Sequence, residues 1–150
     1  MMSFSSYMYK NFSFKINSIF LTPSFKWVEF LLPSTLQLTP FVKLLLEPVK
    51  SDKSFSQMEL GLHEALVNAV RHGNMSDSTK LLRVRRIVTP RWFVLQIQDE
   101  GNGIPSSARV NTLPTELDAE SGRGLYLIHQ CFDDVRWSRR GNRLQIACRR

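Results

Sequence analysis

The spacing of apolar and polar residues changes period several times along this chain, and each change predicts a new element. From Glu59 to Asn74 the apolar side chains recur every three or four positions, which is the period of an amphipathic helix. From Trp92 to Gln98 the apolar residues Phe93, Leu95 and Ile97 alternate with a second set of positions, 92, 94, 96 and 98, that ends in two glutamines, as in a strand with one buried face. Applied to the whole chain, these periods predict a strand at 27–32, a helix from 39 to 47, a helix at 59–74, strands at 81–88 and 92–98, a helix at 123–133, and a hairpin of strands at 135–138 and 143–148.

Residues that start and stop secondary structure support these boundaries. Thr39 is placed to cap the second element, with Pro40 at the first helical position, where its missing N–H is not needed. Gly73 is placed to cap the long helix at its carboxyl end. The short connection Thr89-Pro90 indicates antiparallel neighbours, whereas residues 106–121 show no period and predict a long loop.

The order of these elements predicts an α+β fold. A strand, two helices, two strands, a long loop, a helix and a final hairpin give a two-layer sandwich, with a mixed, mostly antiparallel sheet and the helices on one face. Residues 25–150 are expected to form one domain, since 150 residues suit a single core. Residues 1–24 show no clear period and are expected to be a flexible extension, or upstream sequence from a misassigned start.

Composition and charge narrow the function classes. The formal net charge of +7 suits nucleic acid or an acidic protein partner, and the protein partner is favoured because no nucleic-acid-binding motif accompanies the basic residues. No apolar run approaches the roughly 20 residues of a membrane helix, and residues 1–24 make a poor secretory signal. Cys131 and Cys148 form no CxxC pair and are expected to be buried thiols of a cytoplasmic protein.

Candidate chemistry begins on the long helix. Glu64 and Asn68 are four residues apart, or about 40° around a helix axis, so both point away from the apolar stripe. Arg71 joins this face, and His72 lies at its edge, where packing is a more common role for histidine than catalysis. Taken alone, such a helix is an ordinary surface helix. No basic residue stands at 60, 67 or 68 to pair with Glu64, which favours a chemical role for its carboxylate.

A first glycine-bearing segment follows the second central strand. It contains Asp99, Gly101, Gly103 and Ile104. Glycines let a flat ring approach the backbone closely, and a carboxylate accepts hydrogen bonds from an amine on such a ring. A plain Asp-x-Gly turn explains the same residues equally well.

A second glycine-bearing segment opens the last predicted helix. It contains Gly122, Arg123, Gly124 and Leu125. The free N–H groups and the positive dipole end of a helix start bind anions, and glycines keep the approach clear. Arg123 is equally suited to contact phosphate and to point into solvent.

Together the three segments resemble a known family. Glu64-x-x-x-Asn68, Asp99-x-Gly101-x-Gly103 and Gly122-Arg-Gly124-Leu are similar to the three nucleotide-binding boxes of the histidine-kinase-like ATPases, which share the Bergerat fold. The phrases HEALVNAVRHGN and ESGRGLYLI are most similar to its anti-sigma regulatory factors, which are serine/threonine kinases. The resemblance covers roughly residues 27–148 and implies the same two-layer fold.

The resemblance implies ATP and Mg²⁺ as ligands, with roles for particular residues. Asn68 would hold Mg²⁺ through its carboxamide oxygen, a hard ligand that adds no negative charge beside a triphosphate. Glu64 would be the general base that deprotonates the attacking hydroxyl. Asp99 would accept a hydrogen bond from the exocyclic amine of adenine, and Ile104 would pack on the ring. Arg109, in the long loop, is a candidate contact for the γ-phosphate.

The same resemblance implies an anti-sigma factor that phosphorylates a small antagonist protein and sequesters a sigma factor. Two alternatives stay open: a non-catalytic module that switches on binding ATP or ADP, and a detached catalytic domain of a histidine kinase, although no phosphoacceptor hairpin is recognisable in the sequence. Relatives of this branch commonly form homodimers, and the sequence leaves the oligomeric state open. Without a GxxxxGK[ST] segment or an HRD and DFG pair, a P-loop enzyme and an ordinary protein kinase are excluded.

Overall fold

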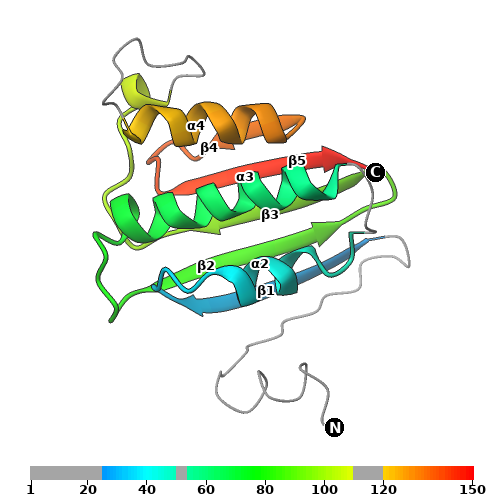
Figure 1. The fold of residues 1–150 in the computed structure, drawn as a ribbon, viewed down its shortest axis with the longest axis horizontal. Coiled ribbons are helices and arrows are strands. Elements are labelled where there is room, and N and C mark those ends of the chain that lie inside the picture. The colour runs from blue at the N-terminus through cyan, green and yellow to red at the C-terminus, as the bar shows by residue number, and fades with distance from the viewer. Residues whose placement is uncertain (1–24, 50–53, 110–119) are drawn as a thin grey trace, which may run out of the picture.

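The fold has two layers, a five-stranded sheet and a layer of helices on one of its faces (Figure 1). The structure is a computed structural model, and it describes residues 25–49, 54–109 and 120–150. The predicted α+β fold is confirmed, and the sheet is simpler than expected because every neighbouring pair of strands is antiparallel. The extension predicted at residues 1–24 lies outside the described residues, as does most of the loop predicted at 106–121.

The strands follow the chain order except at one edge, where the last strand, β5, lies between β3 and β4. The order across the sheet is β1-β2-β3-β5-β4. The strand bounds are β1 Lys26–Pro33, β2 Leu81–Val88, β3 Trp92–Gln98, β4 Asp134–Trp137 and β5 Arg143–Arg149. The bounds predicted for the two central strands, 81–88 and 92–98, are confirmed, and the burial along β3 alternates as its sequence does.

One row of paired residues shows how this alternation builds the core. Phe30, Val84, Ile97 and Leu144 are consecutive partners across β1, β2, β3 and β5, and each is at most 6% exposed. Side chains two residues apart on a strand share a face, so the neighbouring rows extend the same apolar surface. Each such side chain, when fully buried, contributes about 1.5–3 kcal/mol to folding.

Three helices cover this apolar face. Their bounds are α2 Thr39–Leu46, α3 Phe55–Asn68 and α4 Glu120–Cys131. Figure 1 shows α3 lying along the middle of the sheet, with α2 on the β1 side and α4 on the β4 side. Leu62 and Leu66 of α3 are completely buried, so the apolar stripe of the long helix faces the sheet and its polar side is left for other contacts.

The long helix ends differently from the prediction. α3 stops at Asn68 and continues as a π-helical turn, Ala69–Gly73, in which the N–H of Asn74 donates to the carbonyl of Ala69 at 2.8 Å. The prediction that Gly73 caps the helix is therefore wrong, because Gly73 is the last residue of the turn itself. A π-helical turn accommodates one extra residue, and such turns are frequent at functional sites.

Two other helix starts differ from the prediction by a few residues. Leu38, and not Thr39, is the cap residue of α2, although Pro40 lies in the first turn as predicted. α4 begins at Glu120 and not at residue 123, so Gly122 and Gly124 lie inside its first turns. Signals in the sequence locate helix ends only to within about two to four residues, since the terminal hydrogen bonds also depend on tertiary contacts.

Candidate functional site

Glu64 and Asn68 meet α4 at Gly124. A Cβ atom built on Gly124 would lie 3.2 Å from Glu64 Oε2 and 3.4 Å from Asn68 Nδ2. The polar side of α3 therefore faces the glycine segment of α4, and two of the three segments singled out in the sequence lie side by side. A larger residue at 124 would press on both side chains.

α3 and α4 lie antiparallel along each other, with a glycine at each end of their contact. At the far end a Cβ on Gly61 would lie only 2.6 Å from the Cβ of Cys131 and 2.7 Å from Cε2 of Phe132. Asn68 follows Gly61 on α3, and Gly124 precedes Cys131 on α4 by the same number of residues, as expected for two antiparallel helices. The close approach at Gly61 therefore sets the distance at which α4 crosses Glu64 and Asn68.

The polar groups at this contact are incompletely paired. Asn68 Nδ2 is buried and has no hydrogen-bond partner among the described residues, and within the same ranges Glu64 forms no ion pair. A buried amide group without a partner costs about 1–3 kcal/mol, and a ligand at the site would explain its presence. Because the two ends of a carboxamide have the same shape, a half-turn of Asn68 presents its oxygen at this position.

Asp99 approaches the same region from the end of β3. Its carboxylate lies against Gly73 so closely that a Cβ on Gly73 would overlap it. A Cβ on Gly101 would in turn overlap the carbonyl oxygen of Gly73. The π-helical turn thus ends in glycine because the Asp99 segment touches its backbone there. This contact brings the third segment of the sequence to the end of α3.

Asn74 ties these parts together, and the periodicity of the sequence does not reveal it. The residue is completely buried. Its Oδ1 accepts the N–H of Glu100 at 2.8 Å, and its Nδ2 donates to the carbonyl of Leu81 at 3.2 Å. One side chain therefore joins the end of α3, the start of β2 and the residue after Asp99. The only signal in the sequence is that Asn74 closes the HGN phrase.

The environment of Asp99 perturbs its titration. Burial raises the pKa of this carboxyl above its usual value of 3.8, although the N–H of Gly101 and the charges of Lys80 and Arg140 act in the opposite direction. The Gly101 N–H donates to Asp99 Oδ1 at 2.8 Å. A carboxylate has several acceptor sites, so this one can still accept a hydrogen bond from an amine. A carboxyl with a perturbed pKa, half-buried between two glycines, is typical of a binding site.

The segment after Asp99 is held against the β4–β5 turn. Gly103 has a φ of +86°, a conformation that favours glycine, and a Cβ there would overlap the carbonyl of Arg140. The N–H of Ile104 donates to the carbonyl of Gly141 at 3.1 Å. These contacts place Gly103 and Ile104 in a fixed loop beside Asp99, as a surface for a ring requires.

Arg109 fastens the loop after Asp99 to the β4–β5 turn. Its guanidinium donates twice to the carbonyl of Ile104, at 3.0 and 2.8 Å, and to the carbonyls of Ser138 and Arg139 at 3.1 and 3.2 Å. These four bonds leave one of its five N–H donors, and the contact with the γ-phosphate stays a prediction.

The remaining predicted residues lie around this centre. Gly122 and Arg123 lie in the first turns of α4, with Arg123 exposed, and Leu125 packs against the core. Arg71 and His72 are both exposed on the π-helical turn. The expectation of a packed His72 is wrong, because the extra residue of the turn rotates its position away from the helical face.

The fold and the site together define an α+β domain in which a polar helix face, a half-buried aspartate and the glycine-bearing first turns of α4 are gathered at the end of one long helix. The histidine kinase-like ATPase domain family matches residues 44–148, and the chain belongs to this family. Membership implies that the domain binds ATP, usually together with Mg²⁺. A comparison with curated proteins finds no significant match. Within the described ranges, none of the helices is long and apolar enough to cross a bilayer.

The donors at the site fit Mg²⁺ bound with a nucleotide better than a metal held by protein alone. Among residues 25–49, 54–109 and 120–150, no group of three or more His, Cys, Asp or Glu side chains could hold a metal ion. Mg²⁺ usually keeps several waters and takes its remaining ligands from phosphates and one or two protein oxygens. The unpaired carboxamide of Asn68 is suited to supply such an oxygen.

Proposed function

We propose that this protein is an ATP-dependent serine/threonine protein kinase that acts as an anti-sigma factor. The contact of Glu64 and Asn68 with Gly124 carries the proposal, because it brings a carboxylate and a carboxamide against the first turns of α4. Membership of the family supports ATP as the phosphoryl donor. The resemblance of HEALVNAVRHGN and ESGRGLYLI to the anti-sigma kinases supports a protein substrate.

Each site residue has one task in the proposed reaction. Asp99 accepts a hydrogen bond from the adenine amine, and the N–H groups at the start of α4 bind phosphate oxygens. Asn68 would hold Mg²⁺ through its carboxamide oxygen, and the ion would supply positive charge beside the phosphates. Glu64 takes the proton of a serine or threonine hydroxyl as that oxygen attacks the γ-phosphorus, and ADP leaves.

The proposed partners are a small antagonist protein, which carries the accepting hydroxyl, and a sigma factor. Both would be met in the cytoplasm. The net charge of +7 supports partners with acidic surfaces.

The substitution Glu64→Gln tests the catalytic part. Transfer of radiolabelled phosphate from ATP to candidate antagonists is expected to fall at least about 100-fold, the lower end of what a general base supplies. The affinity for ATP, measured by fluorescence titration, is expected to stay the same, because Glu64 is assigned to the attacking hydroxyl and not to the nucleotide. The matched control is Glu59→Gln, the same chemical change earlier on α3.

Two outcomes would contradict the proposal. Absence of phosphate transfer to every antagonist that binds the wild-type protein would contradict the proposed kinase activity. A Glu64→Gln protein that still responds normally to its antagonist in cells would instead support a non-catalytic switch that reads ATP or ADP.

A further inference from the structure

A hollow in the surface lies at the opposite end of the sheet from Asp99. Its volume is about 470 Å³, within the range of about 300–1,000 Å³ typical of ligand sites. The residues around it are Lys26, Val28, Glu47, Pro48, Arg86, Val88, Pro90 and Arg150. Pro90 lies before the start of β3 and Asp99 follows its end, so the whole strand, about 20 Å long, separates the two sites.

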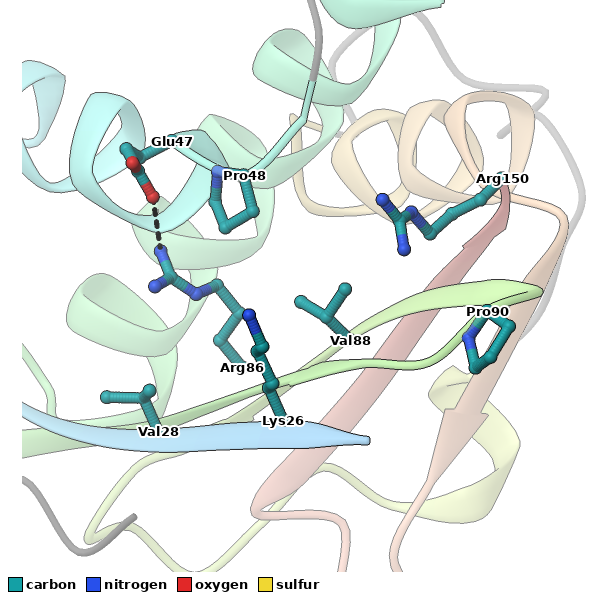
Figure 2. Close-up of a pocket in the computed structure, with 8 residues that line it drawn as sticks. All are labelled: Lys26, Val28, Glu47, Pro48, Arg86, Val88, Pro90 and Arg150. Carbon is teal, nitrogen blue, oxygen red and sulfur yellow. Dashed lines mark ion pairs between the residues drawn. The ribbon is translucent and has the colours of Figure 1, made fainter. Parts of the chain in front are cut away.

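The register of the first two strands creates this hollow. Lys26 pairs with Val88, and Val28 pairs with Arg86, so all four side chains point to the helix-covered face. α2 ends at Leu46, and the helix layer therefore stops short of this corner of the sheet. Figure 2 shows these side chains arranged with Pro48 and Arg150 around one open space.

One of the three cations at the hollow is already engaged. Arg86 NH1 donates to the carbonyl of Leu44 at 2.8 Å and lies 4.0 Å from Glu47 Oε2 (Figure 2). Its guanidinium also lies over the ring of Phe30, 5.2 Å from the centroid. Arg86 thus satisfies the carboxyl end of α2 and forms the wall of the hollow.

The other two cations face the open space. Arg150 NH1 donates to the carbonyl of Thr89 at 2.9 Å, which holds the side chain in place and leaves further guanidinium donors for a ligand. Lys26 is exposed, and in the part of the chain that the structure describes it forms no ion pair. Val28 and Val88 give the hollow an apolar wall.

We propose that this hollow binds an acidic segment of a protein partner that also carries apolar side chains. Carboxylates of the segment would pair with Lys26 and Arg150, and an apolar side chain would cover Val28 and Val88. The apolar wall of Val28 and Val88 suits an apolar side chain and offers nothing to a phosphate chain, so a peptide fits better than nucleic acid. The proposal does not depend on the nucleotide site or on kinase activity.

A peptide titration followed by NMR tests the proposal. The isotope-labelled full chain is titrated with a capped Leu-Asp-Glu-Leu peptide, and with a control peptide that has Asn and Gln in place of the two acids. Saturating shifts are expected at the amides of Lys26, Val88 and Arg150 with the acidic peptide only. Binding of the acidic peptide is expected to weaken in about 1 M NaCl, where charges are screened beyond about 3 Å.

Charge reversal locates the binding energy. The double substitution Lys26→Glu and Arg150→Glu is expected to lower the affinity for the acidic peptide at least about tenfold. Each reversal of charge replaces an attraction with a repulsion. Arg139→Glu, an exposed cation in the β4–β5 turn, is the control and should bind as the wild type does. Thermal unfolding checks the fold, and Lys26→Gln alone replaces the double variant if that protein is unfolded.

Three results would overturn the proposal. The first is an absence of peptide-dependent shifts at this corner of the sheet. The second is equal binding of the acidic and the amide peptide. The third is tighter binding at the same amides by inorganic phosphate or by a DNA oligonucleotide, which would assign the hollow to a different ligand.

Discussion

Asp99 occupies a position that lowers the stability of the fold. Burial raises its pKa above 3.8, which means that the folded protein holds the acidic proton more tightly than the unfolded chain does. Linkage gives the sign: stability falls as the pH rises from 3.8 through the pKa of the folded state, and the loss is complete above that pKa. A carboxylate retained at such a cost is best explained by the ligand that it binds.

The substitution Asp99→Asn is therefore expected to separate stability from binding. Asparagine can still accept the Gly101 N–H, but it has no charge to bury, so Tm at neutral pH should rise. The difference in Tm between variant and wild type should shrink as the pH falls through the raised pKa of Asp99, because the wild-type carboxyl then becomes protonated as well. ATP affinity should fall at least about tenfold, since a charge-assisted hydrogen bond is lost. A difference in Tm that does not change with pH would contradict this account.

Asn68→Ala tests the assignment of the metal ligand. ATP titrations with and without Mg²⁺ are expected to show tighter binding with the metal for the wild type and no such difference for the variant. The fold should tolerate the change, because the amide nitrogen of Asn68 has no partner among the described residues. Gln57→Ala removes an exposed carboxamide from the same helix and serves as the control. If Mg²⁺ still tightens ATP binding in Asn68→Ala, Asn68 is not the metal ligand.

At the scale of elements, the packing of α3 on α4 depends on two glycines with different neighbours. A Cβ on Gly61 meets the Cβ of Cys131 at 2.6 Å, and a Cβ so close to its own backbone cannot move away without a shift of α4. A Cβ on Gly124 meets the ends of the Glu64 and Asn68 side chains at 3.2 Å or more, and these can rotate. The first contact holds the helices together, and the second borders the site.

Alanine is therefore expected to lower stability at position 61 and to weaken ATP binding at position 124. Gly61→Ala should lower the free energy of unfolding by about 1–3 kcal/mol, as overpacked contacts do, and should affect ATP binding only through stability. Gly124→Ala should leave urea unfolding nearly unchanged and weaken ATP binding. Paired urea and ATP titrations measure both, and the reverse order of effects would show that the helix contact has been misassigned.

Elements with a regular pattern could be predicted from the sequence, and irregular ones could not. Strands 81–88 and 92–98 were predicted with the correct bounds, because alternation directly reflects burial on one face. The end of the long helix could not be predicted, because the π-helical turn depends on how Gly73 and Asn74 meet the Asp99 segment. The partners of Arg109 escaped prediction for the same reason, since carbonyls of a distant turn leave no mark on local sequence.

At the scale of the whole molecule, a polar row crosses the open face of the sheet. Its members are partners on all five strands: Glu29, Arg85, Gln96, Gln145 and Arg136. Glu29 is only 8% exposed, and it accepts from Arg83 at 3.1 Å and from Arg85 at 2.6 Å. Gln96 donates to Gln145 at 2.9 Å. Side-chain bonds thus link neighbouring strands on the face that none of the described helices covers.

Glu29→Ala is expected to lower the free energy of unfolding by about 1–3 kcal/mol, because two arginines lose a charged acceptor at once. The loss should be smaller in high salt, since both arginines are partly exposed and are screened. Asp134→Ala is the control: its pair with Arg136 is more exposed and should contribute no more than about 1 kcal/mol. Urea unfolding at low and high salt measures both, and equal losses would show that the row adds nothing.

The π-helical turn also marks a place where the length of this chain can vary in evolution. Its hydrogen bond from Asn74 to Ala69 spans one residue more than the bonds of an α-helix, so the turn fits an extra residue into about one rotation. Losing one exposed residue such as Arg71 would restore an α-helical turn and keep Gly73 facing Asp99. Natural variants are therefore expected to gain or lose a residue in this turn more readily than inside α3, where one deletion rotates every later position by about 100°.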